Sequence, residues 1–273
     1  MPARARLAAQ LYAAVAWRGF RRHATYRAAT IAGVFTNTIF GVIIAYTFLA
    51  LWKQQPQLGG YGAAQALTFV WFAQALIMPV GLFGGTMLEW PERVRTGAVA
   101  LDLLRPLDLQ SWRLAEDLGR AALHVLTRGV PSLLPGLVFF DLALPERVRT
   151  WALFALSLLL AVVVGFTLRY LLGLLAFWVV DIAGFATVLI TAQLFLSGMV
   201  LPLRVFPDWL RAVTDVLPFR CLVQLPLDVL LGEDTGTSAA PLLAVQLAWA
   251  VGLLAVGRLV THRAVRVVVV QGG

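Results

Sequence analysis

Charged residues are scarce in this 273-residue chain, and two residue types are almost absent. Only 13% of the residues are charged, lysine occurs once, at Lys53, and cysteine occurs once, at Cys221. A soluble domain carries about 25% charged residues, so this chain has too few to cover a folded core in water. The 60% hydrophobic content and the mean hydropathy of +0.83 therefore indicate an integral membrane protein. Soluble enzymes, disordered regulators and fibrous proteins are excluded on the same grounds.

The motifs of common catalytic and metal sites are also missing. There is no G-x-x-x-x-G-K-[ST] loop, so ATP binding through a P-loop is excluded, and there is no HExxH or G-x-S-x-G motif. A single cysteine cannot form a disulfide framework within the chain or a cysteine-based zinc site. The histidines, His23, His124 and His262, lie too far apart in sequence to indicate a metal cluster. Ser197-Gly198 is better explained as a packing or turning position than as a nucleophile. We expect no catalytic residue and no metal site.

Long apolar runs divide the chain into six predicted spans, each near the roughly 20 residues that a membrane-crossing helix needs. Residues 1–27 are rich in arginine, and we expect an interfacial helix there instead of a signal peptide. The predicted fold class is thus an all-α integral membrane protein, with one transmembrane domain over 1–273. The expected spans are 28–52, 62–87, 114–140, 150–179, 182–203 and 238–258.

Arginine accounts for nearly all of the formal net charge of +8. In a soluble protein this excess would suggest nucleic-acid binding, whereas in a membrane protein it keeps loops in the cytoplasm. Fourteen of the 22 Lys and Arg residues lie within 1–27, in the charged stretch 89–120 or within 258–266, and six lie on the opposite side. The positive-inside rule therefore predicts cytoplasmic N- and C-termini, and we expect no nucleic-acid partner.

Carboxylates are the usual coupling groups of ion-driven carriers, and the predicted spans offer few. We find only Glu89 at a span end and Asp181 at a cytoplasmic turn. Arg128 and Arg169 are the charges that we place truly within the membrane, where each can snorkel, pair with a carboxylate or face a polar cavity. The shortage of central acids argues against a secondary transporter.

The charged segment 89–112, between spans two and three, has the features of a docking helix. Pro91 suits the first turn of a helix, and Glu92 then lies near its positive end. Gly97 interrupts this helix, and a short apolar helix follows, closed by the Arg105-Pro106 pair. Such a helix fits a groove on a partner, although an amphipathic loop resting on the bilayer explains the composition equally well.

The segment 204–234, between spans five and six, contains two short apolar stretches. In the first stretch, apolar residues recur at helical spacing from Phe206 to Leu217, and Pro218 ends it. The second stretch, 221–231, is closed by Gly232. Neither stretch is long enough to span a bilayer, so we expect both to enter the outer leaflet and return. An interfacial loop helix without a transport role is the alternative.

These residues resemble the membrane subunit of ABC-2 type exporters. The order is an interfacial helix, two spans, a cytoplasmic segment of the form E…R-x-G…LL-x-P, four more spans, and a re-entrant G-x-x-x-P…F-P-x-W-L…L-P-F…G region. The similarity covers essentially the whole chain and extends to the subgroup that contains drug- and antibiotic-resistance permeases.

The resemblance implies a subunit that pairs with a second permease, identical or homologous, and sits on two copies of a separate ATPase. ATP and magnesium would be bound by that ATPase, with no cofactor on this chain, in the plasma membrane of a bacterium. The expected activity is ATP-driven export of a hydrophobic, amphipathic or cationic drug-like compound. Export of a lipid or glycan, an ATP-independent carrier or channel, and a membrane assembly protein remain alternatives.

The resemblance also assigns roles by position. The coupling helix would comprise Glu92, Arg93, Arg95, Gly97, Leu103, Leu104, Arg105 and Pro106. Many relatives carry glutamates where this chain has Arg93 and Arg95, so specific ion pairs with the ATPase do not carry over. Candidate path-lining residues, each of which could instead bond to a neighbouring helix, are Asn37, Thr38, Gln74, Thr187, Thr191 and Gln193. The re-entrant gate would comprise Gly198, Pro202, Phe206, Trp209 and Pro218.

Overall fold

A computed structural model describes residues 2–25, 27–83, 90–103, 108–232 and 238–267, which form helices joined by turns. No strand occurs in these ranges, which confirms the predicted all-α class. The longer helices are α1 (Pro2–His23), α2 (Arg27–Gln54), α3 (Ala63–Val80), α6 (Leu109–His124), α7 (Val130–Phe139), α8 (Val148–Leu174), α9 (Ala183–Leu196) and α13 (Ala239–Val267). The short helices are α4 (Trp90–Arg95), α5 (Val99–Leu103), α10 (Asp208–Asp215) and α11 (Gln224–Leu230), with single turns η1 (Leu58–Gly60), η3 (Val125–Gly129), η4 (Leu175–Phe177), η5 (Leu203–Val205) and η6 (Pro218–Cys221).

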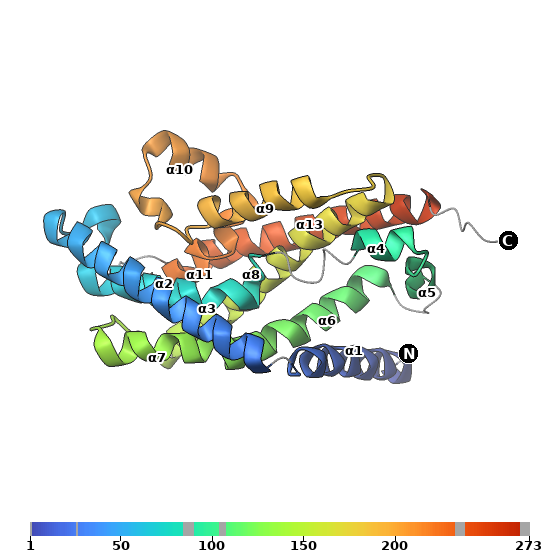
Figure 1. Ribbon diagram of the computed structural model, residues 1–273, viewed down its shortest axis with the longest axis horizontal. Helices are drawn as coiled ribbons and strands as arrows, with labels where there is room; N and C mark the ends of the chain where they lie inside the picture. The colour runs from blue at the N-terminus through green and yellow to red at the C-terminus, as the bar shows by residue number, and fades with distance from the viewer. Residues whose placement is uncertain (1, 26, 84–89, 104–107, 233–237, 268–273) are drawn as a thin grey trace.

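Figure 1 shows an elongated molecule. The N- and C-terminal ends lie toward the same end, together with α4 and α5, whereas α10 lies toward the other end. Five helical stretches within the described ranges are long and apolar enough to cross a membrane. They are Ala28–Gln54, Ala63–Val80, Leu109–Phe139, Val148–Phe177 and Ala239–Arg266.

Helix α3 is the centre of the core. Its sequence has no charge and is apolar on every side, and each residue from Ala66 to Ile77 is buried. The helix ends at Val80, seven residues before the predicted boundary at 87. Gly81 takes a left-handed φ of 76° there, and its N–H bonds to the carbonyl of Ile77 at 3.1 Å. A glycine in this conformation closes a helix at no steric cost.

The third long helix is continuous from Leu109 to Phe139, through α6, the π-helical turn η3 and α7. It begins five residues before the predicted boundary because Asp108 caps it, with an oxygen that accepts the Ser111 N–H at 2.8 Å. The two prolines in the predicted span, Pro131 and Pro135, lie within α7. The π turn shifts the bonding pattern just before them, so the helix continues.

Helix α9 occupies the place of the predicted fifth span but has only 14 residues. At 1.5 Å per residue it measures about 21 Å, shorter than the roughly 30 Å hydrocarbon layer. The chain turns soon afterwards at Gly198, which has a φ of 89°. Figure 1 shows α9 running alongside α8 and α13. The six-pass topology therefore stays a prediction, with five helices of sufficient length and this shorter sixth one.

The two halves of the 204–234 segment differ sharply in burial. Every residue from Cys221 to Leu231 is buried, and α11 packs against α3, α8 and α13. Helix α10 lies on the surface, and the side chain of Trp209 is 70% exposed. Short, irregular segments are tolerated at membrane depth when protein surrounds them, and α11 meets that condition.

Candidate functional site

The predicted docking segment forms two short helices at the end that carries both termini (Figure 1). Helices α4 and α5 are joined through Gly97, whose φ of 71° is in the left-handed region. The Gly97 N–H bonds to the carbonyl of Val94 at 3.1 Å, and Thr96 Oγ1 donates to the carbonyl of Glu92 at 2.8 Å. The side chain of Glu92 is exposed. The interruption predicted at Gly97 is therefore present.

Arg93, which the resemblance places on the docking surface, is paired within the chain. Its Nη2 lies 2.5 Å from Asp102 Oδ2, and Arg113 Nη2 lies 2.9 Å from the same oxygen. Asp102 is buried, so these pairs tie α4 to α5 and α6. The side chains of Arg95 and Leu103, and the residues Leu104, Arg105 and Pro106, lie outside what the structure describes. Docking of an ATPase on this segment stays a prediction.

A buried charged cluster connects the end of α3 to α6 and α8. Asp117 on α6 accepts bonds from Arg120 Nε at 2.7 Å and from Arg169 Nη2, on α8, at 2.8 Å. The side chains of all three are at most 7% exposed. We call these three residues the buried triad. Two cations share one anion here, so the triad carries a net charge of +1.

The arginines of the buried triad also bind the last carbonyls of α3. Arg120 donates to the carbonyls of Met78 at 2.7 Å and Pro79 at 3.1 Å. Arg169 Nη1 donates to those of Val80 at 2.5 Å and Gly81 at 3.1 Å. The terminal carbonyls of a helix have no partner inside the helix, and here guanidinium groups supply one. The chain leaves α3 at this point toward the docking segment.

The buried triad corrects the sequence interpretation of the span charges. Glu89 and Asp181 were expected to be the carboxylates nearest the spans, yet Asp117 lies in a spanning helix and is buried. Of the fates considered for Arg169, pairing with a carboxylate is the one observed. Arg128 instead donates to the carbonyl of Ala29 on α2 at 2.8 Å.

A second polar cluster joins Tyr61, just before α3, to Arg204 and to two residues of α11. The Tyr61 hydroxyl donates to Asp228 Oδ1 at 2.7 Å, and Gln224 Nε2 donates to the same oxygen at 3.1 Å. Arg204 Nη2 pairs with it at 2.8 Å. Burial raises the pKa of Tyr61 far above its usual range, so its hydroxyl stays a donor. Burial also raises the pKa of the Asp228 carboxyl, against the effect of Arg204.

One of the predicted gate residues, Gly198, lies against Gln224 of this cluster. A Cβ at Gly198 would lie 2.8 Å from Gln224 Oε1, so no larger residue fits without a shift. Gln224 Oε1 also accepts the Leu203 N–H at 2.8 Å. The other predicted gate residues are the buried Pro202 and Pro218, the half-buried Phe206 and the exposed Trp209. Their role as a gate stays a prediction.

The predicted path-lining residues do not form one surface in the single chain. Asn37 Nδ2 donates to the backbone carbonyl of Gln74 at 3.4 Å, so these two meet between α2 and α3. Gln193 is only 1% exposed, and its amide has no hydrogen-bond partner among the described residues. The remaining candidates are the half-buried Thr38 and the exposed Thr187 and Thr191.

Two histidines that are distant in sequence are neighbours in the structure. The ring centroids of His23 and His124 are 5.9 Å apart, in an edge-to-face arrangement. His23 Nδ1 also lies 3.0 Å from the carbonyl of Gly19. Among the described residues, no group of three or more His, Cys, Asp or Glu side chains is placed to hold a metal ion.

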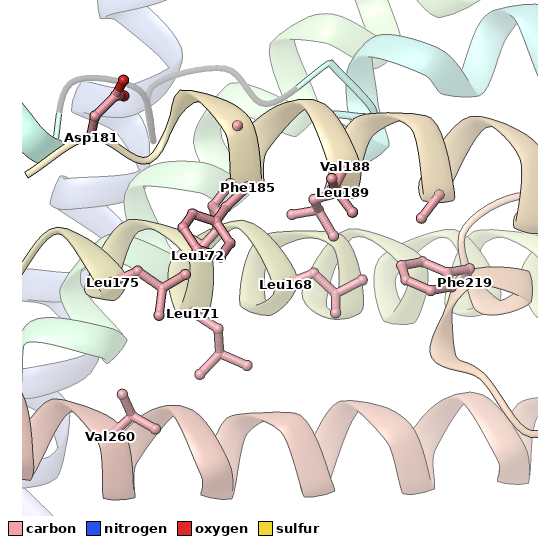
Figure 2. Close-up of a pocket in the computed structure, with 12 residues that line it drawn as sticks. Leu168, Leu171, Leu172, Leu175, Asp181, Phe185, Val188, Leu189, Phe219 and Val260 are labelled. Carbon is pink, nitrogen blue, oxygen red and sulfur yellow. The ribbon is translucent and has the colours of Figure 1, made fainter. Parts of the chain in front are cut away.

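Figure 2 shows an apolar groove of about 830 Å³ between α8, α9 and α13. Leucine side chains of α8 form one wall, Phe185 and Val188 of α9 face them, and Val260 comes from α13. Asp181 lies at one end, and Phe219 at the other (Figure 2). Asp181 is the only charged residue among the described residues that line this groove. Its Oδ1 accepts the Ala183 N–H at 2.8 Å.

Comparison with known families decides the identity of this helical membrane protein. Residues 36–272 match the family described as ABC-2 family transporter protein. The chain belongs to the ABC-2 transporter family. It is a multi-pass membrane permease of an ABC exporter, and as a transport subunit it is not itself catalytic. A comparison with curated proteins finds no match.

Sequence reasoning missed two features of this ABC-2 permease. Asp117 was overlooked because it lies near the charged start of its span. The available signal was its spacing of three residues from Arg120, which places the two opposite charges on one face of a helix. The groove of Figure 2 was missed because its leucines are indistinguishable in sequence from residues that face lipid.

Proposed function

We propose that this ABC-2 permease exports its substrate with energy from separate ATPase subunits, which dock on α4 and α5. The observation that carries the proposal is the buried triad. Arg120 and Arg169 hold the end of α3, from which the chain leaves toward α4, and Asp117 joins them. A displacement of the docking segment would therefore pull on α3, α6 and α8 together. Because the chain has no P-loop motif, nucleotide hydrolysis must come from another subunit.

The proposed complex contains two permease chains and two ATPases, in the plasma membrane of a bacterium, with cytoplasmic termini. The common placement of both termini and α4 at one end agrees with docking on the cytoplasmic side. On α9, Thr187 and Thr191 point away from the protein core. In the pair of permeases, these two hydroxyls would line a path between α9 and the partner chain. ATP binding would then shift the spans between inward- and outward-facing states.

The proposed substrate is an apolar compound with a positive charge. The groove between α8, α9 and α13 is lined by leucine, valine and phenylalanine, which suits an apolar body. Asp181 lies at one end of the groove with its carboxylate oxygens turned away from the leucine wall (Figure 2), so the positive charge of the compound would lie just outside that end. A glycan substrate fits this groove less well, because the lining offers no polar side chain besides Asp181 among its described residues.

The test is purification of the full-length permease from its native membrane, followed by identification of co-purifying proteins and an ATPase assay. We expect a P-loop ATPase in the complex, with hydrolysis that rises on addition of a lipophilic cation such as tetraphenylphosphonium. A neutral compound of similar shape should stimulate less. ATP hydrolysis by the permease chain alone, or transport by a complex that lacks any ATPase, would overturn the proposal. Stimulation by glycans or phospholipids alone would overturn the substrate class.

A further inference from the structure

An arginine-rich pocket of about 250 Å³ lies between α1, α4, α5 and α6. The helices that line it lie toward the end of the molecule that carries both termini (Figure 1). Four cations and two anions line it, so its described lining carries a net charge of +2. The lining residues used below are Arg18, Arg22, Arg93, Asp102, Arg113 and Glu116.

The two carboxylates form ion pairs with three of the arginines. Asp102 pairs with Arg93 and Arg113. Glu116 pairs with Arg113 at 3.1 Å and with Arg22 at 3.3 Å. These pairs hold three guanidinium groups around one small space. Because the side chains are already ordered, binding of a ligand costs little additional conformational entropy. The pocket is therefore a preorganised site for an anion.

Arg18 supplies the remaining positive charge. It lines the pocket and is exposed, and no described residue pairs with it. Its substitution therefore breaks none of the ion pairs that hold α1, α4, α5 and α6 together. An incoming anion would be the partner of this guanidinium.

An exposed apolar face of α1 leads into the pocket. Leu7 is 71% exposed and Leu11 is 41% exposed. Leu7, Leu11 and Arg18 are separated by four and seven residues, so they share one face of the helix. Val15 and Arg22, which line the pocket, lie on the adjacent part of that face. A ligand with an apolar chain and an anionic head would contact both surfaces at once.

We propose that this pocket binds the phosphate group of an anionic phospholipid, with the acyl chains along the leucine face of α1. Guanidinium groups match phosphate oxygens with planar, charge-assisted hydrogen bonds. The net charge of +2 favours a phosphomonoester head over a zwitterionic one. The apolar face favours a lipid over free phosphate or an acidic side chain of a protein. Because Arg93 belongs to the docking segment, a bound lipid would also brace α4 against α1 and α6.

The test is native mass spectrometry of the purified full-length chain with phosphatidic acid, and with phosphatidylcholine of the same acyl composition. We expect selective retention of phosphatidic acid, and about tenfold weaker retention in Arg18→Gln, since a hydrogen bond to a charged group is worth roughly that factor. Arg21→Gln is the matched control. It removes the same charge from the exposed surface of the same helix, outside the pocket lining, and we expect a change below about twofold.

Equal retention of the two lipids, or equal losses in Arg18→Gln and Arg21→Gln, would overturn the proposal. Displacement of phosphatidic acid by an equal concentration of inorganic phosphate would overturn the lipid assignment. If Arg18→Gln leaves phosphatidic acid binding unchanged and instead releases a co-purifying ATPase, the pocket receives a protein carboxylate, and the proposal fails. None of these outcomes depends on transport activity.

Discussion

Substitution of Asp117 by asparagine tests the buried triad most cleanly. Asparagine keeps the size and shape of the side chain, so the change opens no cavity. It removes the only negative charge of the triad and leaves two buried guanidinium groups, those of Arg120 and Arg169, with a net charge of +2. Both arginines keep their bonds to the carbonyls at the end of α3.

The size of the effect follows from the burial of all three groups. Removal of one partner from a buried ion pair costs about 3–5 kcal/mol, because the remaining charge stays uncompensated. For a protein of this size, each kcal/mol corresponds to roughly 2–4 °C in Tm. We therefore expect Asp117→Asn to lower the Tm by about 6 °C or more. The double variant with Arg120→Gln returns the net charge to +1, and part of the loss should be recovered.

The assay is thermal unfolding of the full-length permease in detergent. Glu116→Gln is the matched control, because Glu116 is the adjacent residue on α6 but pairs with Arg22 and Arg113 in a more exposed setting. A partly exposed pair of this kind is worth about 0–1 kcal/mol, so we expect a shift of a few degrees at most. If Asp117→Asn and Glu116→Gln have the same Tm, the triad does not hold α3, and the reasoning is refuted.

Two further substitutions test other contacts. Gly119→Ala should separate α1 from α6, because the added Cβ would lie 1.8 Å from the carbonyl oxygen of Ala16. We expect a loss of about 1–3 kcal/mol by thermal unfolding, as for other overpacked sites. Asp181→Asn should weaken stimulation by a lipophilic cation up to about fivefold, as expected for the loss of one exposed ion pair, and leave neutral compounds unaffected. Asparagine can still accept the Ala183 N–H, so the start of α9 is preserved.

Each of these changes has a control within the chain. Gly252 on α13 has nothing within 4 Å of an added Cβ, so Gly252→Ala should be neutral or slightly stabilising. If Gly119→Ala behaves the same way, α1 and α6 are not closely packed. Asp141→Asn removes the same charge from an exposed connecting segment outside the groove. An equal loss of cation stimulation in Asp141→Asn and Asp181→Asn would exclude a specific role for Asp181.

The helical architecture could be predicted because the signals are local. Uncharged runs such as Ile31–Trp52 indicate spans, and glycines or prolines mark their ends. The boundaries were less predictable. Helix α3 stops at Val80, where Gly81 accepts a left-handed conformation, although the apolar sequence continues beyond it. Helix α6 starts early because of one cap at Asp108, which a charge-based boundary does not detect.

The polar clusters could not be predicted because they depend on contacts between distant segments. Asp117 and Arg169 are 52 residues apart, and Tyr61 and Asp228 are 167 residues apart. From the sequence alone, each of these polar groups could be interpreted only by itself, as a sign of topology or as an unpaired group within a span. Only the packing of α3 against α6, α8 and α11 makes them partners. The same reason explains why Arg93, predicted from the family resemblance to face an ATPase, is bound to Asp102 within the chain.

The measurement that tests the central claim most directly is export per ATP hydrolysed by two glycine variants in the reconstituted complex. Gly97 and Gly60 have φ values of 71° and 77°, and neither has an atom within 4 Å of an added Cβ. Valine at either position therefore imposes a comparable backbone strain, since a β-branched residue strongly disfavours positive φ. Only Gly97 lies between α4 and α5. We predict that Gly97→Val reduces export per ATP several-fold while Gly60→Val keeps it, and equal export by both variants would contradict docking of the ATPase on α4 and α5.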